Sequence, residues 1–227
     1  MFRKNFILLT GCCLAVSAFV QIKTLKGWGE VIDPDRDCSI KVEKKKLFIT
    51  VPGTLHDLNP RNGKINAPLV LQNVTGDFTV QVKVSGEFQP GEQTTAPKSH
   101  AFNGAGLLLW QDEKNYIRLE RNVWIGDDGK LTCFPPLLEQ CKDGEYAILN
   151  GASTTEPFFK SRSTWLSIKR SGEKILARLS HDGKEWTNVN EFTFALNQNV
   201  RVGIAAINTS NKPFVVEFEE FKLSSLP

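Results

Sequence analysis

The stretch that decides the fold of this chain is residues 104–122, GAGLLLWQDEKNYIRLERN. Two runs of alternating side chains are separated in it by a short polar turn. In the first run Leu107 and Leu109 fall on one face of a strand, with Leu108 and Trp110 on the other, because successive strand residues point to opposite sides. The pattern predicts a β-hairpin.

The second run of this hairpin predicts one apolar sheet face and one mixed face. Ile117 and Leu119 alternate with Arg118 and Glu120. Aromatic and charged side chains on one face suit the recognition of sugar rings and hydroxyl groups, and they also suit an ordinary solvent-facing sheet. Both interpretations stay open. The candidate ligand-binding residues on this face and in loops that would border it are Trp110, Arg118, Glu120, Asn122, Trp124, His56 and Asp57.

Alternation of the same kind recurs along the chain, and no segment sustains a helical period over three turns. Dipeptides with glycine in second place, such as Asp143-Gly144 and Asp182-Gly183, punctuate the runs and suit tight hairpin turns. These features predict an all-β fold, a two-sheet antiparallel jelly-roll sandwich. The expected strands are 47–51, 78–84, 106–110, 116–121, 165–170, 175–179, 192–196, 200–207 and 214–223.

The length and charge of the chain indicate a single domain with no nucleic-acid partner. A chain of 227 residues can bury one substantial core. The formal net charge is +3, and Arg3 and Lys4 supply two of these charges, so three minus two leaves +1 on the rest of the chain. A near-neutral body does not favour binding to a polyanion.

The N-terminus resembles an export signal. Arg3 and Lys4 precede an apolar run over residues 6–20, which is short for a membrane span, and cleavage is expected after Ala18. We therefore predict a signal peptide at 1–18 and one domain at 19–227 in an exported protein, secreted, periplasmic or attached to the envelope. In the alternative, a lipoprotein signal ends before Cys12, which becomes lipidated. This signal or lipid is the only membrane attachment that we expect.

Three cysteines remain after the predicted signal. Cys133 and Cys141 bracket a proline-containing loop, and we predict a disulfide between them, which would stabilise the fold by about 2.5 kcal/mol. The alternative is two separate buried thiols. Cys38 is expected to be a small core residue.

Asp33, Asp35 and Asp37 form a D-x-D-x-D run, which is typical of the start of a calcium loop. An EF-hand is excluded, because its sixth position is Cys38 rather than glycine and its twelfth is Lys44 rather than glutamate. Two interpretations remain, a looser calcium site and a solvated acidic turn. We expect no other cofactor.

Several short motifs support a family resemblance over most of the chain. They are WGEVIDPD at 28–35, VPGTLHDL at 51–58, NAP at 66–68, GDF at 76–78, GAGLLLWQDEKNYIRLER at 104–121 and SHDGKEW at 180–186. Together they resemble the concanavalin A-like lectin/glucanase superfamily, and within it the regulation-of-enolase-like domain of unknown function. That branch is similar to the C-terminal sandwich domain of β-xylosidases. The resemblance implies a two-sheet sandwich, often an accessory or sugar-binding unit, and no established reaction.

Glu120 and the pair Glu217 and Glu219 are the candidate catalytic residues. A glycosidase needs two carboxylates flanking the scissile bond. The pair shares one strand face, but the sequence departs from the glucanase signature, which places an Asp between its two glutamates on that face. We therefore expect an exported, non-catalytic sandwich that binds a glycan or polysaccharide or serves as an accessory module. The alternatives are a glycoside hydrolase or lyase that acts on a glycan, and a protein-interaction module of the envelope.

Overall fold

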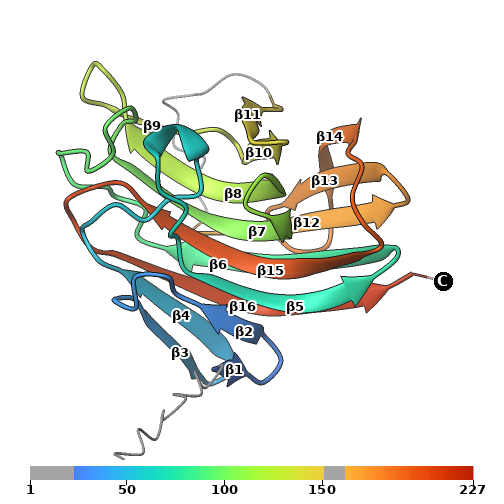
Figure 1. Cartoon of the computed structure of the whole chain (residues 1–227). Coiled ribbons are helices and arrows are strands. Elements are labelled where there is room, and N and C mark those ends of the chain that lie inside the picture. The colour runs from blue at the N-terminus through green and yellow to red at the C-terminus, as the bar shows by residue number, and fades with distance from the viewer. Residues whose placement is uncertain (1–22, 151–161, 227) are drawn as a thin grey trace, which may run out of the picture.

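The computed structural model describes residues 23–150 and 162–226. Figure 1 shows their strands in two stacked layers. The predicted signal at 1–18, with Cys12, lies outside these residues, and so does the start of the domain predicted at 19–227. The all-β, two-sheet antiparallel sandwich predicted from the sequence is confirmed.

The first sheet is antiparallel, with nine strands in the described part of the chain. Eight of them follow the order β1-β2-β5-β15-β7-β8-β10-β11, and β9 pairs with β8. Their bounds are β1 Thr24–Leu25, β2 Gly29–Ile32, β5 Leu69–Thr75, β15 Asn199–Asn208, β7 Phe102–Asp112, β8 Asn115–Ile125, β9 Leu131–Thr132, β10 Leu137–Lys142 and β11 Glu145–Ile148.

The second sheet has seven strands within the described residues, in the order β14-β13-β12-β6-β16-β4-β3. A single turn of 3-10 helix, η1 (Pro60–Asn62), lies between β4 and β5. The strand bounds are β3 Ser39–Glu43, β4 Lys46–Val51, β6 Phe78–Gly86, β12 Ser163–Ser171, β13 Lys174–Ser180, β14 Thr187–Thr193 and β16 Phe214–Ser225. Among the residues described, no helix has the length and apolar character needed to cross a membrane.

The hairpin quoted above forms β7 and β8 at the centre of the first sheet. Leu107 pairs with Leu119 across it. Both belong to the main core between the sheets, together with Leu109 and Ile117. Leu108 points to the opposite face. The period-two pattern therefore predicted correctly which side chains enter the core.

The sequence pattern did not predict every strand. β5 (Leu69–Thr75) and β10 (Leu137–Lys142) begin with consecutive apolar residues, so apolar and polar residues do not alternate where these strands begin. They are buried on both faces where they begin, which removes the polar half of the pattern. The strand expected at 192–196 is β14, which ends at Thr193.

A second hydrophobic cluster covers part of the outer face of the first sheet, the face turned away from the second sheet. Leu108, Ala205 and Ile207 contribute from β7 and β15, and Leu58 and Ala67 contribute from the segment between β4 and β5. We call this segment, residues 53–68, the covering segment. The centre of the first sheet is thus buried on both sides.

The predicted disulfide between Cys133 and Cys141 is wrong for this structure, which has no bond between these two cysteines. Cys133 packs in the main core between the sheets. Cys141, on β10, packs in the second cluster with Tyr116. The two cysteines belong to different clusters on opposite faces of the first sheet, so their side chains are buried separately.

Truncation of the central hairpin tests the core. Leu107→Ala should lower the free energy of unfolding by about 2–5 kcal/mol, because it leaves a cavity where a fully buried side chain packed. Urea denaturation measures the loss. The matched control is Val215→Ala on β16, where the side chain is 50% exposed, and it should change stability by at most about 0.5 kcal/mol. Equal losses in both variants would contradict the assignment of the core.

Candidate functional site

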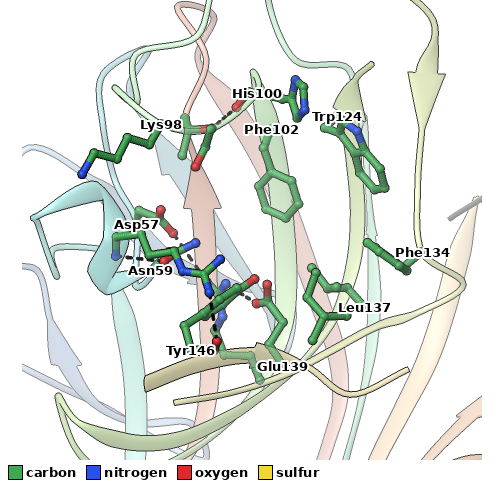
Figure 2. Close-up of a pocket in the computed structure, with 15 residues that line it drawn as sticks. Asp57, Asn59, Lys98, His100, Phe102, Trp124, Phe134, Leu137, Glu139 and Tyr146 are labelled. Carbon is green, nitrogen blue, oxygen red and sulfur yellow. Dashed lines mark hydrogen bonds and ion pairs between the residues drawn. The ribbon is translucent and has the colours of Figure 1, made fainter. Parts of the chain in front are cut away.

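A pocket of about 380 Å³ opens on the outer face of the first sheet (Figure 2). Its floor comes from β8 and β10, through Arg118, Leu137 and Glu139. Asp57 and Arg61 of the covering segment line one side. A pocket of this size lies in the range typical of small-molecule sites.

The floor of the pocket is a cluster of buried charges. Arg118 is adjacent to Glu139 in the register of β8 and β10, and its Nη2 donates a hydrogen bond to the Glu139 carboxylate. Nη1 of Arg118 lies 3.7 Å from carboxylate oxygens of both Asp57 and Glu120. All four residues are at most 4% exposed. One guanidinium therefore faces three carboxylates away from bulk water.

This excess of acid sets the protonation of the floor. Burial, aided by the negative charges of Glu139 and Asp57 and opposed by Arg118, raises the pKa of Glu120 to about 8. Burial also raises the pKa of Glu139. Burial alone would lower the pKa of Arg118, but the carboxylates outweigh it and hold that pKa above its ordinary value. Near neutral pH we expect Arg118 to be charged and Glu120 to keep its proton.

The floor also holds unused hydrogen-bonding capacity. Within residues 23–150 and 162–226, Nε and Nη1 of Arg118 and both carboxylate oxygens of Glu120 have no hydrogen-bond partner. Buried polar atoms of folded proteins are usually paired with protein or water. The pattern is therefore typical of a site that binds polar groups.

Aromatic side chains form the walls. Trp124, at the end of β8, packs on Phe134 with 5.3 Å between ring centroids. The Asn122 side chain fixes this pair, because its amide donates to the Phe134 carbonyl at 2.9 Å and its oxygen accepts from the Phe134 amide at 3.0 Å. On the opposite side the guanidinium of Arg61 lies 5.1 Å from the ring centroid of Tyr146.

Hydrogen bonds within the protein hold Asp57 at the rim. Its Oδ2 accepts from the Asn62 side chain at 2.6 Å, and its Oδ1 accepts from the Leu58 amide at 2.7 Å. Asn62 also donates to Ser99 at 2.9 Å. η1 ends at Asn62, and Gly63 follows it with a φ of 75°.

The structure divides the predicted ligand-binding residues into three groups. Arg118, Trp124 and Asp57 line the pocket. Glu120 and Asn122 lie beside it, fully buried. Trp110 and His56 are elsewhere. The rings of Trp110 and Tyr116 stack with centroids 5.4 Å apart, and His56 contacts Asp37.

The mixed face is therefore not the open platform that the hairpin alone suggested. The covering segment lies over part of it and leaves the pocket at one end.

Sequence reasoning missed several lining residues, namely Arg61, Phe102, Phe134, Glu139 and Tyr146. Glu139 had a signal in the sequence: Leu137, Glu139 and Cys141 alternate as the residues of one strand face do. Because this segment was interpreted as a loop closed by a disulfide, the alternation was not assigned to a strand.

The remaining candidate carboxylates lie apart from the pocket. Glu217 and Glu219, on β16, point away from the main core, and Lys46 lies 2.6 and 3.0 Å from them. Lys83 adds a contact of 3.1 Å to Glu219. They form a charged patch on the solvent face of the second sheet.

The three aspartates of the expected calcium loop have different partners. Asp33 accepts from the Cys38 amide at 3.0 Å. Asp35 accepts from Lys64 and Asn66, both at 2.6 Å. Asp37 lies 2.9 Å from His56 Nε2.

Comparison with known proteins places the chain among domains of similar fold. A family model described as "Protein of unknown function (DUF1349)" matches residues 56–226. No curated protein sequence matches the chain.

Similar solved structures show the same fold. A functionally unknown protein from Saccharomyces cerevisiae has a TM-score of 0.65 at 17% identity, over 88% of this chain and 97% of that one. The carbohydrate-binding module CBM66 from Bacillus subtilis has a TM-score of 0.52 at 11% identity, over 89% and 100%. The GH43 protein BlXynB from Bacillus licheniformis has a TM-score of 0.57 at 14% identity, over 91% of this chain but only 40% of its own length.

The proton on Glu120 makes stability depend on pH. The folded state keeps this proton up to about pH 8, whereas an unfolded glutamate loses it near pH 4.3. Between these values the folded state binds more protons, so the free energy of unfolding should fall as pH rises. In Glu120→Gln the side chain cannot ionise, so the free energy of unfolding should fall less with pH than in the parent. Relative to the parent, the melting temperature of this variant should therefore be higher at pH 8 than at pH 5.

Thermal melting from pH 5 to pH 8 measures this difference. The control is Glu191→Gln, which changes an exposed glutamate on β14 and should leave the slope as in the parent. If Glu120→Gln lowered stability more at pH 8 than at pH 5, Glu120 would be ionised in the folded protein and the assignment would be wrong.

Proposed function

This chain belongs to the family described as a protein of unknown function (DUF1349), and we propose that it is an exported, non-catalytic protein that binds a glycan. The proposed ligand is a terminal sugar unit, held in the pocket over Arg118. The observation that carries this proposal is the buried guanidinium at the pocket floor, with two nitrogens that have no hydrogen-bond partner among the described residues.

The chemistry of the floor suits a ligand with vicinal hydroxyl groups. A guanidinium donates to two neighbouring oxygens at once, and carboxylates accept from hydroxyl groups. Arg118 supplies the first function, and Asp57 and Glu139 supply the second. Charged groups form stronger hydrogen bonds where water is excluded.

The walls suit the apolar faces of a sugar ring. Trp124, Phe102 and Phe134 line the pocket opposite Tyr146. Aromatic rings bury the C–H surface of a sugar while its hydroxyl groups reach the floor. Because the covering segment occupies the rest of this sheet face, a chain end fits the pocket better than a polysaccharide laid across the sheet. The structural neighbour named as a carbohydrate-binding module supports the same function.

Three features support binding without catalysis. Glu120 is fully buried beside the pocket. Glu217 and Glu219 lie on the other sheet, paired with lysines. Glu139 is bound to Arg118. A glycosidase needs an acid and a second carboxylate that both reach the bond to be cleaved.

Trp124 provides the test of sugar binding. A glycan array of the purified protein should identify a ligand, and isothermal titration should measure its affinity. Trp124→Ala should weaken that affinity at least about tenfold, or about 1.4 kcal/mol, because the ring stacks on the sugar.

The matched control for this titration is Trp165→Ala. Trp165 lies on β12, with its ring under Lys83 on the outer face of the second sheet, so affinity should not change. The proposal fails if the folded protein binds no glycan on the array, or if both tryptophan variants lose affinity equally.

The predicted signal gives a separate test of export. The full chain, expressed in a bacterial host, should be recovered outside the cytoplasm with Phe19 as its first residue. Intact-mass spectrometry measures this, and a lipidated N-terminus at Cys12 would instead identify the lipoprotein alternative. Recovery of the uncleaved chain in the cytoplasm would contradict export.

A further inference from the structure

Three side chains of different chemistry converge beside the pocket rim. Asp37, Cys38 and His56 each offer one ligand atom, and the three atoms lie within 4.8 Å of one another. His56 Nε2 lies 2.9 Å from Asp37 Oδ1, and Cys38 Sγ lies 3.7 Å from the same oxygen. Ligands of a tetrahedral zinc ion are about 3.3–3.8 Å apart, given bonds of about 2.0–2.3 Å. The cluster thus has nearly the dimensions of a metal site.

The orientation of His56 suits a metal ligand. Its ring is fully buried, and Nδ1 lies 3.2 Å from the Thr54 carbonyl oxygen. The Thr54 hydroxyl oxygen also lies 3.4 Å from Nδ1. Nε2 lies 2.9 Å from Asp37 Oδ1, so one ring nitrogen contacts the backbone of Thr54 and the other faces the cluster. Metal-bound histidines typically hydrogen-bond to a carbonyl through their second ring nitrogen.

The donor set selects the kind of metal. Calcium binds oxygen atoms, usually six to eight of them. A set of sulfur, nitrogen and oxygen is typical of zinc and related transition metals. Asp35, which the calcium interpretation required, is held by Lys64 and Asn66 instead.

Access and a further polar group complete the site. The side chain of Asp37 is 44% exposed, so a cation can enter from solvent. Asp33 accepts from the Cys38 amide through Oδ2, and its Oδ1 is buried without a hydrogen-bond partner in the described part of the chain.

We propose that Asp37, Cys38 and His56 bind a divalent transition metal such as zinc. On binding, the Cys38 thiol would release its proton to solvent and coordinate as thiolate. The metal would join the loop before β3 to the start of the covering segment. His56 is followed directly by Asp57, so the metal would also steady one wall of the pocket.

Cobalt absorption tests the proposal directly. The full chain with Cys12→Ser and Cys13→Ser serves as the parent, so that Cys38, Cys133 and Cys141 are its cysteines. Addition of Co²⁺ should produce a thiolate-to-cobalt charge-transfer band that saturates at one equivalent. Cys38→Ser should abolish the band, and the matched control Cys141→Ala should keep it. A parent without the band, or a Cys38→Ser variant that retains it, would overturn the proposal.

Metal-dependent melting provides a second measurement. Zn²⁺ should raise the melting temperature of the parent, and EDTA should reverse the rise. Cys38→Ser and His56→Asn should bind Zn²⁺ at least about 100-fold more weakly. Asp35→Asn should respond to Zn²⁺ like the parent. If Ca²⁺ instead stabilised the protein, and Asp35→Asn but not Cys38→Ser removed that effect, the site would be the oxygen site of the calcium interpretation.

Discussion

The guanidinium of Arg118 is a positive charge that bulk water does not reach, and the organisation of the pocket follows from that constraint. Removing a charge from water costs several kcal/mol unless other charges and hydrogen bonds replace the water. β10 supplies Glu139, β8 supplies Glu120, and the covering segment supplies Asp57. The register between β8 and β10 and the position of the segment before β5 are thereby linked to one buried charge.

The burial of Arg118 goes together with a first sheet that is covered on both faces at its centre. Its inner face packs in the main core, and its outer face packs under the covering segment. Two glycines of β7 allow close packing there. A Cβ atom on Gly104 would lie 2.5 Å from the Phe102 ring and 2.8 Å from Glu120 Oε2, and one on Gly106 would lie 2.0 Å from the Leu119 carbonyl oxygen. A larger residue would therefore displace the Phe102 ring or the Glu120 side chain at the first position, and the backbone of β8 at the second.

The covering segment connects the pocket with the proposed metal cluster. Two backbone hydrogen bonds, of 2.9 and 3.0 Å, fix His56 against Asn208 of β15. From this anchor the side chain of His56 reaches the loop that carries Asp37, while that of Asp57 reaches Arg118. Two consecutive residues thus contact the proposed metal cluster and the floor of the pocket.

The sequence by itself determined the fold class, most of the strands, and which face of β7 and β8 enters the core, because a period of two is a local property of the chain. It also placed Arg118, Trp124 and Asp57 among the lining residues. It failed for Glu139, for the separation of Cys133 from Cys141, and for the cluster of Asp37, Cys38 and His56. These relations depend on strand order, on register and on which loop covers which face. Only the tertiary structure decided them, since they depend on which strands pair and on which sheet face each side chain enters, and neither spacing nor composition records this.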